Sequence, residues 1–118
     1  MKIFIVDNEI QQREELKLIL TQIKEISLIC EAANENDLQC LFKTYTPDYI
    51  LINTALHTIE TLQIIRSIVY EYRGTIIIAI SDFEQMDKIM PLIHAGARNY
   101  ILKNNLSVDS MRKRLGLN

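Results

Sequence analysis

Seven polar or charged residues stand at or directly after the ends of apolar runs in this chain, and their types could support binding chemistry. A carboxylate can hold a cation, whereas a hydroxyl, an amide or an ammonium group can donate hydrogen bonds to an anion. No Ser-His-acid set or pair of carboxylates is expected to converge among them, so we predict that the protein is not an enzyme. The residues are Asp7, Asn8, Glu9, Asn53, Ser81, Asp82 and Lys103.

The apolar runs that precede these residues are short, rich in isoleucine and mostly continuous. A short continuous apolar run is typical of a strand that is covered on both faces. We therefore predict strands at residues 2–6, 27–31, 48–53, 75–80 and 99–102.

Segments with a helical period separate the predicted strands, because apolar residues recur there every three or four positions. Asn34 and Asp82 are expected to be helix N-caps, and Gly74 and Gly96 stand where helices should end. The apolar stripes are Leu16, Ile19, Leu20 and Ile23; Leu38, Leu41, Phe42 and Tyr45; Leu62, Ile65, Val69 and Tyr72; Met86, Ile89, Met90 and Ile93; and Val108, Met111 and Leu115.

The alternation of strand and helix, repeated five times, predicts an α/β fold with right-handed βαβ crossovers. The expected architecture is a doubly wound five-stranded parallel sheet in a three-layer α/β/α arrangement. Ligands of such folds bind at the carboxyl ends of the strands, where the seven polar residues should meet. The sequence contains no repeat or linker, so residues 1–118 are expected to form a single domain.

Composition and charge exclude several classes of protein. With 48% hydrophobic and 24% charged residues, the chain resembles an ordinary globular domain, and its net charge of -2 predicts no direct nucleic-acid binding by this domain. Cys30 and Cys40 lack metal-ligand spacing and are interpreted as free, buried thiols in a reducing compartment. No signal peptide or membrane-spanning run is evident, so we expect a cytoplasmic protein without membrane contact.

Several motifs in register resemble the receiver domain of two-component response regulators. "IFIVDNE" is similar to the first strand and acidic pair of that family, and "TPDYILINTALHTIETLQIIR" to its third strand, phosphoacceptor and following helix. "TIIIAIS" is similar to the fourth strand, which ends in Ser or Thr, and "AGARNYILK" to the fifth, with its aromatic switch residue and lysine. "ISLICEAANENDLQCL" is closest to receivers that precede a helix-turn-helix output domain. The resemblance covers essentially the whole chain and implies a flavodoxin-like (βα)5 fold.

The same resemblance implies that the family's reaction is missing here. In the family, two acidic residues and the acceptor aspartate hold Mg²⁺, and the acceptor is also the nucleophile. In this sequence Asp7 retains the first acid, Asn8 replaces the second and Asn53 occupies the acceptor position. Glu9 follows closely but is expected to point away. We therefore predict an atypical receiver, or pseudo-receiver, with no aspartyl phosphorylation, weak or absent Mg²⁺ binding and no other cofactor.

Ser81, Tyr100 and Lys103 match the family's switch positions. Without an acceptor they are interpreted as a buried hydroxyl, an aromatic residue at the edge of the core and a member of an ion pair. Lys103 is expected to pair with Asp7 and with the amide oxygen of Asn53, which would close the pocket without metal.

Other departures from the family pattern lie in the loops. His57 and Thr61 replace a proline and a glycine, and His57 is expected to be solvated. Asn104 also replaces a proline, so we predict a trans peptide bond before it. Pro91 would remove a hydrogen bond from the fourth helix, which should be kinked or begin only near Ile89.

The resemblance implies a regulatory domain that acts through a protein partner or through self-association, on the face formed by the fourth helix, fifth strand and fifth helix. A C-terminal DNA-binding domain outside this chain would make transcription its output. Two alternatives stay open. Asn53 could be an engineered replacement in an ordinary receiver, or the chain could be a flavodoxin-like small-molecule binder, although no glycine-rich phosphate loop is present.

Overall fold

A computed structural model describes residues 1–54, 58–82 and 84–118 of the chain. Strands and helices alternate along the described residues, with one short 3₁₀ helix, η1, before the last α-helix. The elements are β1 (Lys2–Val6), α1 (Ile10–Leu20), β2 (Leu28–Ala32), α2 (Glu35–Phe42), β3 (Tyr49–Asn53), α3 (Thr58–Glu71), β4 (Ile76–Ser81), α4 (Met86–Ala95), β5 (Asn99–Leu102), η1 (Lys103–Asn105) and α5 (Val108–Arg114).

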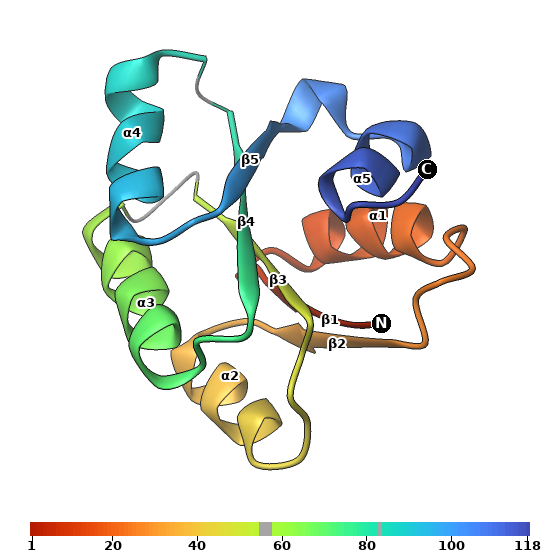
Figure 1. Cartoon of the computed structure of the whole chain (residues 1–118), viewed down its shortest axis with the longest axis horizontal. Coiled ribbons are helices and arrows are strands. Elements are labelled where there is room, and N and C mark those ends of the chain that lie inside the picture. The colour runs from red at the N-terminus through yellow and green to blue at the C-terminus, as the bar shows by residue number, and fades with distance from the viewer. Residues whose placement is uncertain (55–57, 83) are drawn as a thin grey trace.

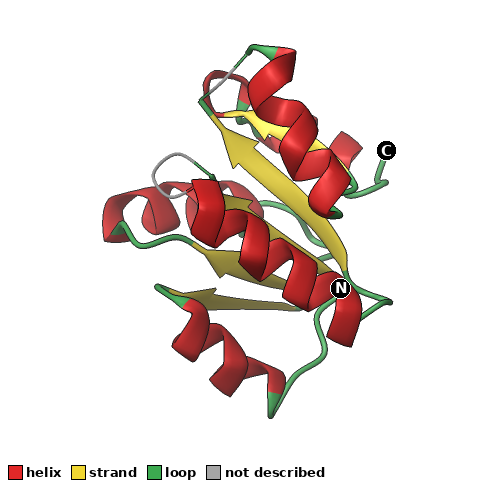
Figure 2. Cartoon of the chain, turned by 90° about the vertical axis from the view of Figure 1, so that its left-hand side faces the viewer, coloured by secondary structure: helices red, strands yellow, loops and turns green. Residues whose placement is uncertain are grey.

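The five described strands form one parallel sheet in the order β2-β1-β3-β4-β5 (Figure 1). Helices α1 and α5 pack on one face of the sheet and α2, α3 and α4 on the other, which makes the three layers seen in Figure 1. Figure 2 looks onto the face that α2, α3 and α4 cover. The predicted doubly wound α/β fold is therefore confirmed. Since strand order reverses beside β1, the loops after β1 and β3 flank the expected ligand crevice.

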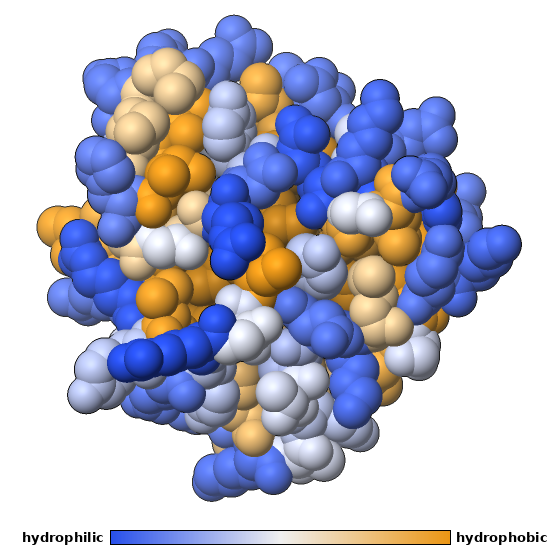
Figure 3. Space-filling view, viewed as in Figure 1, coloured by the Kyte–Doolittle hydropathy of each residue, from blue (hydrophilic) through white to orange (hydrophobic). Residues whose placement is uncertain are grey.

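Each face of the sheet has its own hydrophobic core. The core under α2, α3 and α4 includes Phe4, Ile50 and Ile77, whereas the core under α1 and α5 includes Ile3, Leu51 and Ile78. Successive strand residues thus point to opposite faces and are buried on both, which explains the continuous apolar runs. On the face seen in Figure 3, hydrophobic residues gather mostly in the middle and hydrophilic residues around the outline.

Two buried threonine hydroxyls connect β3 and β4 beyond the ends of the strand ladder. The hydroxyl of Thr75, just before β4, donates to the Pro47 carbonyl at 3.0 Å. The hydroxyl of Thr54, just after β3, donates to the Ile80 carbonyl at 2.9 Å. Both hydrogen bonds are buried, so the pair of strands is tied at each end by a polar contact.

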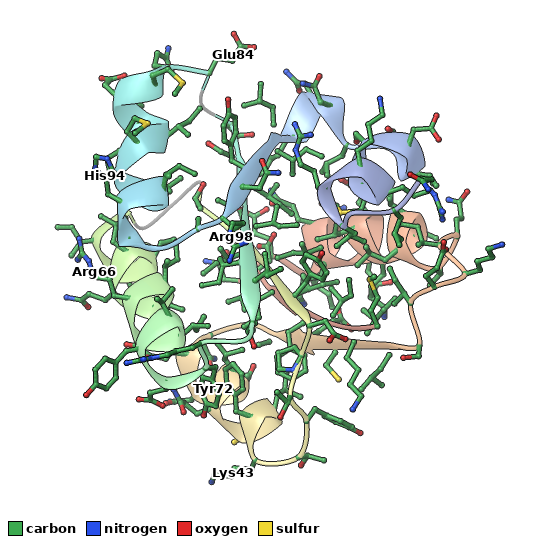
Figure 4. The ribbon with its side chains drawn as sticks, in the orientation of Figure 1. Lys43, Arg66, Tyr72, Glu84, His94 and Arg98 are labelled. Carbon is green, nitrogen blue, oxygen red and sulfur yellow. The ribbon has the colours of Figure 1, made fainter. Side chains whose placement is uncertain are left out.

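An aromatic stack joins α2 to the end of α3. The rings of Phe42 and Tyr72 lie parallel, with centroids 3.7 Å apart, and Phe4 meets Phe42 edge-on at 5.5 Å. Figure 4 shows Tyr72 lying between the two helices, whereas Arg66 on α3 and His94 on α4 point outward. Tyr72 therefore fixes the end of α3 against α2.

The helix ends agree in part with the sequence prediction. The side chain of Asn34 caps α2 by accepting from the Asp37 N–H at 2.9 Å, which confirms that cap. Asp82 is not the N-cap of α4, because the helix begins four residues later and Gln85 occupies that position. Gly96 ends α4 with a φ of 129°, as expected for a glycine stop.

Pro91 lies inside α4, and the helix begins at Met86. Of the two alternatives, a start only near Ile89 is therefore wrong, whereas the kink stays a prediction. The buried side chains of Ile89 and Leu92 hold this helix to the sheet, and that packing offsets the hydrogen bond that proline removes.

The expectation for the thiols also needs correction. Cys30 and Cys40 are free, but Cys40 is exposed and Cys30 only partly buried. In the described part of the chain, no helix is long and apolar enough to cross a membrane.

A bidentate ion pair ties α5 to the loop before β2. The Nη1 and Nη2 atoms of Arg112 each lie 2.8 Å from a carboxylate oxygen of Glu25. Hydrogen bonding from Arg112 is the main reason that the pKa of Glu25 falls from 4.5 to about 2. A carboxylate whose pKa is lower in the folded state stabilises the fold at pH values above its ordinary pKa, and this contribution is lost as the pH falls towards 2.

We therefore expect Arg112→Met to lower the unfolding midpoint at neutral pH, with the difference from wild type shrinking between pH 4.5 and about 2. Urea unfolding across this pH range measures the effect. Arg66→Met is a matched control, because Arg66 is exposed and forms no ion pair with any described residue. A difference for Arg112→Met that stays constant down to pH 2 would contradict this assignment.

Candidate functional site

The residues that the sequence singled out meet at the carboxyl edge of the sheet. Asp7 follows β1, Asn53 ends β3, Ser81 ends β4 and Lys103 follows β5. The N–H of Asp7 donates to the Ala32 carbonyl at 3.0 Å, which continues the pairing of β1 with β2 past the end of the strand. This backbone hydrogen bond therefore holds Asp7 in place without the help of a ligand.

Asn53 and Asp7 form the centre of the site. The Asn53 Nδ2 atom donates to Asp7 Oδ2 at 3.0 Å and to the side-chain oxygen of Gln12 at 2.8 Å. Asp7 is 8% exposed, and its other carboxylate oxygen accepts from the N–H of Glu9 at 2.9 Å. The Asn53 amide thus donates a hydrogen bond to the buried Asp7 carboxylate. An ionised carboxylate in its place has no proton to donate at neutral pH.

Sequence reasoning missed Gln12. It lies in the first turn of α1, where its Nε2 donates to Glu9 Oε2 at 3.1 Å while its Oε1 accepts from Asn53. The sequence did contain a signal for this residue: it is polar, it follows the acidic cluster closely, and it lies at the start of the next predicted helix. Asn8 and Glu9 are exposed, and Glu9 turns its carboxylate towards Gln12.

The donor set does not fit a Mg²⁺ ion. Hard cations such as Mg²⁺ need oxygen ligands in near-octahedral geometry, usually with at least one carboxylate. Asp7 is the carboxylate at the centre, and the atom of Asn53 that faces it is a nitrogen, which has no lone pair for a metal. Among the described residues, no group of three or more acidic, histidine or cysteine side chains could hold a metal ion.

Lys103 does not pair with Asp7 as expected. Its Nζ atom lies 3.5 Å from Asp82 Oδ2, in the loop after β4, so the expected closure of the pocket through Asp7 and Asn53 is wrong. Lys103 belongs to η1, where the chain turns away from the sheet, and this turn carries the side chain towards β4. The peptide bond before Asn104 is trans, as predicted.

The other switch positions occupy different environments. Ser81 is fully buried at the end of β4. Tyr100 is partly buried on β5 and packs against the core under α2, α3 and α4, and its backbone carbonyl accepts from the Arg114 side chain at 3.0 Å. His57 lies outside the described residues, so the prediction for that side chain stays untested.

A cavity of about 260 Å³ adjoins Asp7 and Asn53, on the side of α2 and α3. A smaller one, of about 120 Å³, lies between Asp7, Gln12 and Lys103 on the side of α1. The hydrogen-bonded group of Asn53, Asp7 and Gln12 therefore separates two hollows at the same edge of the sheet.

Comparison with curated proteins finds relatives among transcriptional regulators. The chain is 24% identical to "Uncharacterized transcriptional regulatory protein YhcZ" of Bacillus subtilis over 114 residues, covering 97% of this chain and 53% of that protein. It is 30% identical to the transcriptional regulatory protein YdfI of the same organism over 106 residues, covering 90% of this chain and 49% of YdfI. The chain spans about half the length of these relatives.

Solved structures share the fold at low sequence identity. A response regulator from Thermotoga maritima superposes with a TM-score of 0.86 and 23% identity, covering 98% of this chain and 93% of that one. A LuxR-family DNA-binding response regulator from Staphylococcus aureus gives a TM-score of 0.81 at 13% identity, covering 98% and 95%. Residues 3–115 match the family described as "Response regulator receiver domain". Given this match over nearly its whole length, the chain belongs to the response regulator receiver domain family.

Proposed function

We propose that this receiver domain regulates its output without phosphorylation of an aspartate. The observation that carries the proposal is the Asn53 Nδ2 atom, which donates to Asp7 Oδ2 at 3.0 Å where the family places its acceptor carboxylate. Phosphoryl transfer to an acceptor needs a nucleophilic oxygen and a cation that neutralises the phosphoryl group. An amide supplies neither a nucleophile nor a negative charge for the cation.

The position of Asn8 supports the same reading. It replaces the family's second acid, and its side chain is neutral and exposed. Two neutral amides and one carboxylate therefore stand where the resemblance places three carboxylates, and the attraction for a divalent cation falls accordingly. We infer that the fold of the family is retained while its phosphorylation chemistry is lost.

The output that we propose is control of transcription, by residues 1–118 as one receiver domain within a longer regulator. The relatives are named transcriptional regulators, and this chain matches about half of their length. Signalling would then depend on association with a protein partner or a second copy, through the face formed by α4, β5 and α5. Met86, on α4, is 54% exposed and available for such contact.

Incubation with acetyl phosphate and Mg²⁺ tests the proposal. We expect the intact mass of the wild-type protein to stay unchanged, because no carboxylate stands at the acceptor position. The matched positive control is the double variant N8D/N53D, which restores both acids. It should gain about 80 Da, and the adduct should be lost on treatment with base, as an acyl phosphate would be.

Two results would count against the proposal. A base-labile adduct on the wild-type protein would show that another carboxylate accepts the phosphoryl group. A wild-type protein that changes its association state with acetyl phosphate, while acetate and inorganic phosphate, the products of its hydrolysis, leave that state unchanged, would also contradict it.

A further inference from the structure

The larger of the two cavities adjoins Asp7, Asn8 and Asn53 and extends beyond them towards α2 and α3. It lies between the carboxyl ends of β1 and β3 and the first turns of α2 and α3, with a volume of about 260 Å³. Val6, Ile52 and Ile64, which are 2–8% exposed, form an apolar part of its wall. A pocket with apolar walls and a few converging polar groups is the usual form of a small-molecule site.

The polar part of the cavity wall is negatively charged. Asp7, Glu35 and Glu60 contribute carboxylates, and no lysine, arginine or histidine is present among the described lining residues. None of these three carboxylates forms an ion pair with another described residue. Arg13 approaches only the backbone carbonyl of Asp7, at 2.6 Å, and its charge is paired with Glu31. The cavity therefore favours a cation.

A second, independent observation comes from Thr61 on α3. Its side chain lines the cavity although the residue is only 6% exposed, and its hydroxyl has no hydrogen-bond partner among the residues that the structure describes. Its oxygen keeps some access, because no fully buried side-chain oxygen or nitrogen in the described residues lacks a partner. The hydroxyl of a nearly buried residue that lines a cavity can accept a hydrogen bond from a donor bound there.

We propose that this cavity binds a small organic cation that carries an ammonium or guanidinium group. The cationic group donates to the Thr61 hydroxyl and lies within reach of the Glu60 and Asp7 carboxylates, while its methylene groups rest on the apolar wall. The cavity is smaller than the roughly 300–1,000 Å³ of drug-sized pockets, so its ligand is smaller than a drug molecule. This site goes beyond the proposed function, because ligand binding in the cavity requires neither a phosphoryl group nor a protein partner.

Titration with agmatine, which has a guanidinium at one end and an ammonium at the other, tests the inference. We expect its binding to shift the amide NMR signals of Asn8, Glu60 and Thr61, with a Kd on the order of 1 mM or below. The uncharged diol 1,4-butanediol should leave these signals unchanged. The affinity should fall when NaCl rises from about 20 to about 200 mM, because salt screens the carboxylates.

Three single variants locate the binding. T61V keeps the shape but removes the hydroxyl, and should weaken agmatine about tenfold, the value of one hydrogen bond to a charged group. E60Q removes one partly solvated charge and should weaken it about two- to fivefold. E71Q removes the same charge from the exposed far end of α3, outside the cavity, and should bind like the wild type.

The inference is overturned if about 20 mM agmatine shifts none of these signals, or if T61V and E60Q both bind it like the wild type. It is also overturned if MgCl₂ alone shifts the same signals and agmatine does not, because the cavity would then be a metal site. These measurements need no phosphoryl donor, so their failure leaves the acetyl phosphate result unaffected.

Discussion

The N53D variant is expected to be less stable than the wild type at pH 7, although it restores the residue that the family uses. The Asn53 Nδ2 atom donates to two oxygens, at 3.0 Å on Asp7 and 2.8 Å on Gln12. Replacing this donor by a carboxylate oxygen puts two negative groups side by side and turns both hydrogen bonds into contacts between acceptors. We expect the free energy of unfolding to fall by about 2–3 kcal/mol.

The loss in N53D should depend on Mg²⁺ in a defined direction. Two carboxylates that share a site repel when both are charged. Adding about 10 mM Mg²⁺ should recover part of the stability of N53D and more of that of N8D/N53D, because the cation gains a second and then a third carboxylate.

Urea unfolding with and without Mg²⁺ measures these effects, and N8D alone is the matched control. Because Asn8 is exposed, its replacement should change the free energy of unfolding by no more than about 0.5 kcal/mol. An N53D protein as stable as the wild type at pH 7 without Mg²⁺ would contradict the hydrogen-bond arrangement described here.

The second large effect is expected at Gly96, where α4 ends. A Cβ atom added to this glycine would clash with the Val69 Cγ2 atom on α3, and the φ of 129° disfavours any residue with a Cβ. We expect G96A to lower the free energy of unfolding by about 2–4 kcal/mol, because a backbone penalty adds to a steric one.

Two variants separate these causes. V69A/G96A should recover the steric part, since Val69 is 37% exposed and its removal alone costs little, while the backbone part stays. G74A is the control for a glycine without constraint, because nothing lies within 4 Å of its added Cβ. Thermal or urea unfolding of the four proteins gives the comparison. Equal stabilities of G96A and G74A would exclude the proposed clash.

The fold could be predicted from the sequence because the two hydrophobic patterns, continuous runs in the strands and stripes every three or four residues in the helices, are both strong. Continuous apolar runs such as Ile76–Ile80 can be buried only in a sheet covered on both sides, and the helical stripes supply the cover. The exact helix starts were harder. Asp82 had the right side chain for a cap, but α4 begins only at Met86, since burial of Ile89 and Leu92 decides which turn is helical.

The site was predictable as a set of residues but not as a set of contacts. Strand ends placed Asp7 and Asn53 correctly, because parallel strands share their carboxyl edge. The partner of Lys103 was predicted wrongly, since η1 redirects the chain after β5 and a flexible lysine can reach either Asp7 or Asp82. Gln12 could not be ranked above its neighbours from sequence, because its role depends on the rotation of α1.

The threonine hydrogen bonds at the two ends of β3 and β4 have a consequence for folding fidelity. Both faces of β4 are apolar, so sliding Ile76–Ile80 by one residue along β3 would exchange one apolar side chain for another at little cost in burial. Such misregistration would separate the Thr75 and Thr54 hydroxyls from the carbonyls of Pro47 and Ile80. Each buried polar group left unpaired costs about 1–3 kcal/mol. The two threonine hydroxyls thus select the native register of β3 and β4 over shifted registers that would bury similar apolar side chains.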